Sequence, residues 1–216
     1  MTHRLRTHPH FPSGDWQVYC RRLRSASLVV AIGALAACTR PRLPVAPVPV
    51  PAGEPGGERP ASPDRSIDDD VEYVRGRHLL VPVANVRPDQ ITDSFDEPRD
   101  GNRRHHAIDI LAPRGTPVLA ADSGRVVRVS WNNAGGNTVY TVDPDARVVY
   151  YYAHLDRYRD SLAAGMPLAK GDTIGFVGTT GNAPKDIPHL HFQIMRMPRD
   201  GKYWAGEPIN PFAMLR

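Results

Sequence analysis

Residues 147–155 read Arg-Val-Val-Tyr-Tyr-Tyr-Ala-His-Leu, a run of β-branched and aromatic side chains that favours a β-strand. Similar short runs occur on both sides of it, separated by turn-forming residues: Leu79–Val83, Thr116–Ala120, Gly124–Val129, Asn137–Val142 and Thr173–Val177. Asn133–Gly136 and Asp143–Ala146 are expected to form turns between them. Few segments have helical periodicity, and Leu162–Leu168 is a short, weak case. The spacing predicts an all-β domain.

Histidine is the most informative residue type in this chain. Three of its nine histidines lie in the first ten residues, and His78 belongs to no motif. The others fall in three short motifs: His105-His106-Ala107-Ile108-Asp109, Tyr152-Ala153-His154-Leu155 and His189-Leu190-His191. A single histidine near a strand end is usually a surface or core residue, but together these motifs supply metal ligands and spare imidazoles.

The spacing within the motifs indicates how their side chains can meet. Residues two apart on a strand point to the same face, about 6.7 Å apart, so one of His189 and His191 can bind a metal while the other handles protons. His105 and Asp109 are about 6 Å apart on a helix but about 13 Å apart along a straight strand. The β-branched residues around Asp109 favour a curved strand or strand-loop.

His105, Asp109 and His191 match the ligand set of a catalytic zinc site, in which three protein ligands leave a fourth position for water. His106 has the opposite strand parity to His105 and is expected to face outward or to lie behind the ligands. The sequence therefore predicts one zinc ion, with His154 and His189 available for proton transfer beside it.

These motifs resemble the M23 zinc metallopeptidases, the lysostaphin or LytM-type peptidoglycan endopeptidases. The resemblance covers roughly residues 78–213 and includes the glycine-rich segment 175–182. It implies that His105, Asp109 and His191 bind Zn2+ and that His154 and His189 are the catalytic pair. Two positions depart from the common pattern, Ala107 in place of glycine and Gln193 in place of glutamate, and neither removes a ligand.

The resemblance also implies a fold and an activity. The fold would be a compact antiparallel β-sheet domain with a groove, of the duplicated hybrid-motif type. The activity would be hydrolysis of peptide bonds in peptidoglycan stem peptides or crosslinks during cell-wall remodelling. Alternatives are a non-enzymatic LytM-type regulator that activates cell-wall amidases, which the intact ligands disfavour, and an exported metal-binding protein without turnover.

The roles of the catalytic pair follow from general chemistry. Zinc lowers the pKa of a bound water from about 15.7 toward 7, and a base must take its proton. His189 is the first choice for this base and His154 for orienting the water and stabilising the oxyanion, although the two roles can be exchanged.

Aromatic and amide side chains near the motifs are candidates for contacts with substrate. Tyr150, Tyr151, Tyr152 and Trp131 are more often core residues at this spacing, with Tyr152 the best exception. Asn133 and Asn182 are expected to form turns rather than to contact substrate.

The N-terminal segment 1–37 resembles a bacterial lipoprotein signal peptide. Basic residues precede an apolar stretch from Ala26 to Ala37, and Leu35-Ala36-Ala37-Cys38 closes it. The stretch is shorter than the roughly 20 residues that cross a bilayer. Cys38 would become the lipidated N-terminus, with an ordinary secretory signal as the weaker alternative. The protein is then exported and anchored to the cell envelope, and Thr39 favours the outer membrane, facing the periplasm, in a Gram-negative host.

Residues 38–70 are expected to form a disordered spacer between the lipid anchor and a catalytic domain at 71–216. The segment from Pro41 to Asp64 is rich in proline and can reach on the order of 75 Å at about 3 Å per residue. Asp68, Asp69 and Asp70 are expected to form a solvated acidic run, with a weak calcium contact as the alternative.

Charge and cysteine content exclude other classes of protein. Residues 1–37 contain five arginines and one aspartate, which account for the whole net charge of +4. The rest of the chain is neutral, so the basic pI is no sign of nucleic-acid binding. The chain has two cysteines: Cys20 lies in the expected signal peptide, and Cys38 would be acylated. No cysteine therefore remains for a disulfide or a metal site. The expected partners are peptidoglycan, the membrane through the Cys38 lipid, and a cell-wall amidase or divisome protein.

Overall fold

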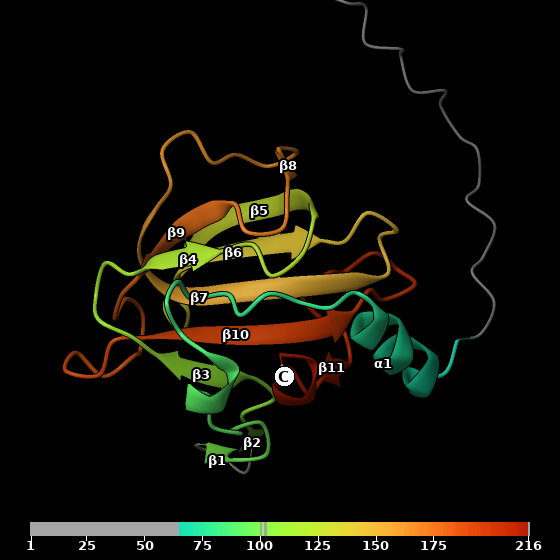
Figure 1. Cartoon of the computed structure of the whole chain (residues 1–216), viewed down its shortest axis with the longest axis horizontal. Helices are drawn as coiled ribbons and strands as arrows, with labels where there is room; N and C mark the ends of the chain where they lie inside the picture. Colours follow the sequence, from blue (N-terminus) through green and yellow to red (C-terminus); the bar gives the residue numbers. More distant parts are fainter. Residues whose placement is uncertain (1–64, 100, 102, 216) are drawn as a thin grey trace, which may run out of the picture. The chain divides into compact units, whose positions relative to one another are not determined.

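The computed structural model describes residues 65–215 except residues 100 and 102, and its main feature is one antiparallel β-sheet (Figure 1). The elements in chain order are α1 (Ile67–Gly76), η1 (Pro88–Gln90), β1 (Pro98–Arg99), β2 (Arg103–Arg104), β3 (Ile108–Leu111), β4 (Pro117–Leu119), β5 (Gly124–Asn132), β6 (Gly136–Val142), β7 (Val148–Tyr158), β8 (Pro167–Leu168), β9 (Thr173–Val177), β10 (His189–Arg196), β11 (Pro208–Ile209) and η3 (Phe212–Met214).

The nine-stranded sheet has the central order β11-β10-β7-β6-β5-β8. β3 also pairs with β10, and β9 pairs with both β4 and β7. β1 and β2 form a separate two-stranded hairpin. The prediction of a mostly antiparallel β domain is confirmed.

The long strand β7 joins two parts of the sheet. Its residues 148–153 pair with β10, whereas Leu155–Tyr158 pair with β9. The change of partner falls at His154, whose φ is 59°, in the left-handed region that non-glycine residues rarely adopt. The fold therefore places this histidine where β9 and β10 separate.

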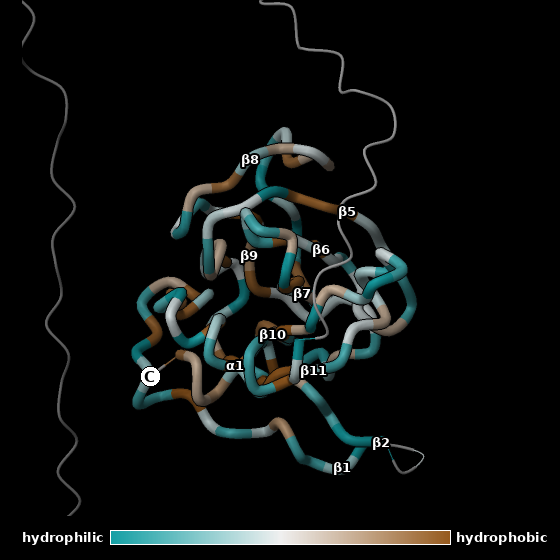
Figure 2. Tube along the Cα trace, turned by 90° about the vertical axis from the view of Figure 1, so that its right-hand side faces the viewer, coloured by the Kyte–Doolittle hydropathy of each residue, from teal (hydrophilic) through white to brown (hydrophobic). Residues whose placement is uncertain are grey.

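The two faces of the sheet near β10 have different chemistry. Leu190, Phe192 and Ile194 are fully buried, and the ring of Phe192 lies 5.2 Å from that of Tyr152. The alternate residues, beginning with His189 and His191, point to the opposite face. Figure 2 shows hydrophobic segments in β5, β7 and β10, and a hydrophilic β1–β2 hairpin.

The helix α1 begins at Ile67, ahead of residue 71, where the sequence analysis expected the domain to start. Ser66 and Asp69 form reciprocal capping hydrogen bonds at its N-terminus.

The prediction of a solvated acidic run is wrong for Asp70, which is 1% exposed. Its carboxylate pairs with three arginines: Arg65, Arg147 and Arg196. A buried charge needs such partners, so Asp70 attaches α1 to the sheet.

Two other predicted elements differ from the structure. Leu79–Val83 forms no strand, although the isolated bridge between Val83 and Val118 and two backbone hydrogen bonds, from Leu80 N–H to Ala121 O and from Leu119 N–H to Pro82 O, connect it to the segment around β4. Pro82 lacks the N–H that a ladder needs. Leu162–Leu168 is a turn that leads into β8 rather than a helix. Within residues 65–215, no helix is long and apolar enough to cross a membrane.

Candidate functional site

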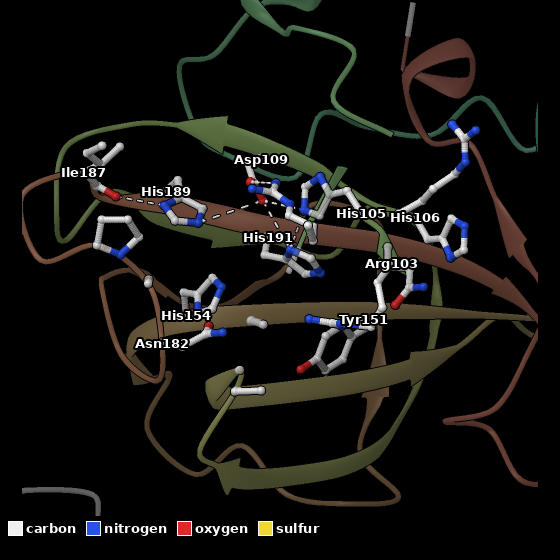
Figure 3. A pocket seen from close by; sticks show the side chains of 18 of the residues that line it. Arg103, His105, His106, Asp109, Tyr151, His154, Asn182, Ile187, His189 and His191 are labelled. Atoms are coloured by element: carbon white, nitrogen blue, oxygen red, sulfur yellow. Dashed lines mark hydrogen bonds and ion pairs between the residues drawn. The ribbon is translucent and has the colours of Figure 1, made fainter. Parts of the chain in front are cut away.

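Strand β10 brings the metal-binding candidates together. His191 is paired across the sheet with Asp109 of β3 on one side and with Ala153 of β7 on the other. His189 lies two residues earlier and points to the same face (Figure 3). The predicted sharing of one face by the two histidines is therefore observed.

His105, Asp109 and His191 converge through one atom each. His105 Nε2 lies 2.9 Å from His191 Nδ1 and 3.1 Å from Asp109 Oδ1, and the third distance, from His191 Nδ1 to Asp109 Oδ1, is 3.2 Å. A tetrahedral zinc ion with bonds of about 2.0–2.1 Å holds its donors about 3.3 Å apart. The three atoms therefore fit the triangular face of a zinc site.

Ser94 holds both ends of the segment from His105 to Asp109. Its carbonyl oxygen lies 3.0 Å from His105 Nδ1, and its hydroxyl accepts a hydrogen bond of 3.1 Å from the backbone N–H of Asp109. A carbonyl can only accept, so His105 carries its proton on Nδ1 and leaves Nε2 free for a metal. His106, with φ 56°, provides the curvature that the spacing required.

The carboxylate of Asp109 is held from two sides. Burial acts to raise its pKa, but the two imidazoles of His105 and His191 beside the carboxylate outweigh burial and bring the pKa well below the usual range. The other oxygen, Oδ2, accepts a hydrogen bond of 2.7 Å from Arg99 of β1. Asp109 is thus a charged candidate ligand, with Oδ1 directed at the two imidazoles and Oδ2 bound by Arg99.

His154 faces the metal-binding candidates from β7. Its backbone N–H donates to Gly135 O at 2.7 Å, and its Nδ1 lies 2.9 Å from Thr180 O. Burial lowers the pKa of His154 to about 4, so the ring is neutral at neutral pH. Because the carbonyl of Thr180 accepts the Nδ1 proton, Nε2 keeps its lone pair.

His189 has the same arrangement on the other side of the site. Its Nδ1 lies 2.8 Å from Ile187 O, and its Nε2 lies 3.8 Å from Asp109 Oδ1. Its ring centroid is 5.0 Å from that of His154. Both imidazoles therefore lie beside the candidate metal site without belonging to the converging triad (Figure 3).

Two glycines allow the loops around His154 to touch. Gly136 and Gly181 have φ values of 65° and 71°, and a Cβ on Gly181 would lie 2.3 Å from both Ala134 O and Gly136 N. Only glycine fits such a contact. This contact between the two loops places the carbonyl of Thr180 within hydrogen-bonding distance of His154 Nδ1 and so orients the imidazole.

The site opens into a groove of about 1170 Å³. The β1–β2 hairpin, the turn at 134–135 and the loop at 182–187 line it, with Tyr151 and Gln193 near the histidines. Tyr150 and Tyr152 are core residues, so the expectation that Tyr152 is the exception is wrong, and Tyr151 is the tyrosine in the groove. Trp131 is 62% exposed and is not a core residue.

The remaining candidates also have places in the structure. Asn182 lines the groove, whereas Asn133 is exposed in its turn. His106 lines the groove as well and packs against Phe95, so it does not simply face outward, and it lies outside the converging triad.

Comparison with known proteins gives the family. Residues 103–211, half of the chain, match the model of Peptidase family M23. The chain belongs to peptidase family M23. The match contains all five site residues, from His105 to His191.

Members of the M23 family with curated descriptions match one part of this chain. Lysostaphin from Staphylococcus simulans is 37% identical over 92 residues, which are 42% of this chain and 18% of lysostaphin. Peptidoglycan DD-endopeptidase ShyC from Vibrio cholerae is 36% identical over 93 residues, 43% of this chain and 20% of ShyC. The chain thus matches about a fifth of the length of these relatives.

A solved structure supports the fold of this M23 domain. Csd3 from Helicobacter pylori has a TM-score of 0.50 and 29% sequence identity, covering 64% of this chain and 34% of Csd3.

The structure brings together the candidate metal ligands and the two further histidines that the sequence predicts, and it adds other residues that no pattern indicated. Ser94 and Arg99 support the candidate ligands, while the carbonyls of Thr180 and Ile187 orient the two free histidines. Cys38, the predicted lipidation site, lies outside the described residues.

Proposed function

We propose that this protein is a zinc-dependent endopeptidase that hydrolyses peptide bonds in the stem peptides or crosslinks of peptidoglycan. The convergence of His105, Asp109 and His191, with His154 and His189 beside them, carries the proposal. A metal-binding triad next to two imidazoles that do not belong to it provides both parts of metal-assisted hydrolysis, a Lewis acid and a proton acceptor.

His105 would hold the metal through Nε2, Asp109 through Oδ1 and His191 through Nδ1, because these are the atoms that converge. Two histidines and one carboxylate form a ligand set typical of zinc hydrolases. When bound, zinc supplies a Lewis acid that polarises a carbonyl and lowers the pKa of water to about 7. Arg99 keeps Asp109 directed at the site by occupying its second oxygen.

His189 is assigned as the general base. Its Nδ1 proton is bound to the carbonyl of Ile187, so the neutral ring has its lone pair on Nε2, on the side of Asp109. This nitrogen can accept the proton of the attacking water and pass it to the leaving amine.

His154 is assigned to orient the attacking water and, once protonated, to stabilise the oxyanion. The lowered pKa, about 4, keeps the ring neutral before the reaction, with Nε2 as its acceptor. His154 and His189 present the same atom to the site, and in this geometry the two roles can be exchanged.

The substrate class rests on the family and on the groove. A relative over part of this chain is named a peptidoglycan DD-endopeptidase. The groove is bounded by a hairpin and two loops, and a cleft that is open to solvent can receive a peptide belonging to a larger polymer. The bond cut in that relative is a property of that protein.

The N-terminal segment completes the proposal. A signal peptide at 1–37, lipidation of Cys38 and a proline-rich spacer at 38–70 would hold the catalytic domain near peptidoglycan. Composition supports this for residues 1–64, which precede the described region, whereas residues 67–70 belong to α1 and not to the spacer. An exported protein anchored in the outer membrane and facing the periplasm is the form proposed for a Gram-negative host, with an amidase or divisome protein as a candidate partner.

The complete set of candidate ligands favours an enzyme over the regulator of cell-wall amidases. A protein that acts only by contact does not need three converging donors or two oriented imidazoles.

The decisive test is release of soluble muropeptides from purified peptidoglycan, followed by mass spectrometry. Zinc-loaded protein should release products cut at a peptide bond, chelator should stop release, and added zinc should restore it. Absence of products from a protein that binds one zinc ion per chain would contradict the proposal.

A further inference from the structure

Three arginines of the β1–β2 hairpin form one wall of the groove. Arg99, Arg103 and Arg104 all line it, and Asp109 is the only acidic residue among the described residues that do so. Asp109 is already engaged by two imidazoles and by Arg99. The groove is therefore a positively charged region on a domain chain that is otherwise close to neutral.

Two of these arginines already have acidic partners. Arg99 binds Asp109 at 2.7 Å, and Arg104 pairs with Asp96 at 3.2 Å. The side chain of Arg103 makes no hydrogen bond or ion pair with any residue in the described part of the chain. It lines the groove beside the candidate metal ligands with its guanidinium available (Figure 3).

The position of Arg103 is unfavourable for the hairpin itself. Arg103 is directly opposite Arg99 in the β1–β2 pairing, and like charges in that relation destabilise a sheet. All four residues of the two strands are exposed, so burial offers no compensation. An arrangement that costs stability at the rim of a site suggests a functional reason for the second guanidinium.

The chemistry of the guanidinium indicates what it would bind. Its planar set of donors matches a carboxylate, with two parallel hydrogen bonds. Acidic residues of peptidoglycan stem peptides carry free carboxylates, which can be converted to neutral carboxamides of nearly the same shape. A carboxamide keeps one oxygen acceptor but lacks the negative charge and the second acceptor, so amidation would cost Arg103 one of the two hydrogen bonds and the charge that strengthens them.

We propose that Arg103 binds a free carboxylate of the substrate peptide and that the enzyme thereby prefers stem peptides with free carboxylates over amidated ones. The inference rests on the proposed function, because it names the chemistry of the substrate at the same groove. Arg103 acts on specificity and lies outside the metal and proton-transfer groups.

The test compares cleavage of two purified crosslinked muropeptides that differ only in whether their carboxylates are free or amidated. Wild-type protein should cleave the free-carboxylate form with a KM lower by about tenfold, the value expected of one hydrogen bond to a charged group. Arg103→Ala should remove this preference by raising the KM for that form, with kcat within about twofold. Added salt should weaken the wild-type preference, because screening acts on exposed charges.

Arg125→Ala is the matched control, since Arg125 is also an exposed strand arginine but does not line the groove. It should keep the wild-type preference. The Arg103 variant should unfold at the wild-type temperature or slightly above it, which separates lost recognition from lost folding.

Equal cleavage of both muropeptides by wild-type protein, or an unchanged preference in Arg103→Ala, would overturn the inference and leave the proposed function standing. Failure of the zinc-loaded wild-type protein to cleave either muropeptide would overturn the proposed function, and the inference with it.

Discussion

At the scale of single residues, the orientation of each imidazole decides what it can do. Three of the four site histidines donate a hydrogen bond from Nδ1 to a backbone carbonyl oxygen and direct Nε2 toward the site: His105, His154 and His189. His191 differs, because its Nδ1 faces Asp109. Backbone carbonyls belong to the folded loops, so the fold sets the tautomers of His105, His154 and His189 before any substrate binds.

Arg99→Ala should weaken zinc binding by about 10- to 100-fold, the usual effect of losing a group that orients a metal ligand. The reason is that Asp109 Oδ2 loses its partner and the carboxylate can rotate away from the triad. Competition with a chromophoric chelator measures the affinity directly, without reference to activity.

Arg104→Ala is the control for that experiment, because Arg104 lies on the same hairpin but pairs with the exposed Asp96. Its zinc affinity should match that of the wild-type protein. Equal zinc affinity in Arg99→Ala and wild-type protein would show that Arg99 has no part in orienting Asp109.

The convergence of the candidate site residues could be predicted from sequence because they are concentrated in short motifs. His189 and His191 share a face through the two-residue period of a strand. Ser94 and Arg99 could not be predicted, since they reach Asp109 from a loop and a hairpin whose course no periodicity specifies. The position of Tyr151 in the groove was missed for a different reason. Successive side chains of β7 alternate between the two faces of the sheet, so Tyr151 faces the groove while its two neighbours, Tyr150 and Tyr152, face the core.

At the scale of elements, the change of partner along β7 positions His154. The turn before β6 and the loop after β9 meet through Gly136 and Gly181, and this contact fixes the carbonyl that orients the ring. The orientation of His154, a candidate catalytic residue, thus depends on two loops that are distant in sequence.

Gly181→Ala should destabilise the protein by about 2–4 kcal/mol and reduce peptidoglycan hydrolysis, because the new Cβ would meet backbone atoms at 2.3 Å. Thermal unfolding and product release measure the two effects.

Gly165→Ala provides the comparison, since Gly165 also has a positive φ, 85°, but nothing lies within 4 Å of its Cβ position. It should cost only about 1 kcal/mol from backbone strain and leave hydrolysis intact. Similar losses in both variants would mean that φ alone, rather than the contact between the loops, explains the effect.

Elements were predictable where the strand pattern is strong and were missed where it is weak. The runs that became β4, β5, β6, β7 and β9 are rich in β-branched and aromatic residues. The helix α1 carries few apolar residues, and its clearest signal is the capping pair Ser66 and Asp69. Leu79–Val83 has strand composition, but Pro82 interrupts its pairing.

At the scale of the whole molecule, one buried carboxylate connects the ends of the domain. Asp70 of α1 pairs with Arg147, just before β7, and with Arg196, at the end of β10. Both strands carry site histidines toward their other ends. The network therefore stabilises the frame on which the site is built, although it lies outside the groove lining.

Asp70→Asn should lower the free energy of unfolding by about 2–4 kcal/mol, because the partly buried arginines lose their shared counter-charge. Chemical denaturation measures the change. Asp68→Asn, in the same turn but exposed, should change it by less than about 0.5 kcal/mol. Equal free energies of unfolding in the two variants would show that the ion pairs of Asp70 do not stabilise the domain.

The most direct test of the central claim measures zinc content and muropeptide release on the same samples of wild-type, His191→Ala and His189→Ala protein. His191→Ala should lose the metal and the activity together. His189→Ala should retain one zinc ion per chain while release falls by at least about 100-fold, the contribution expected of a general base. Release at the wild-type rate by zinc-loaded His189→Ala would contradict the assignment of ligands and proton acceptor at this site.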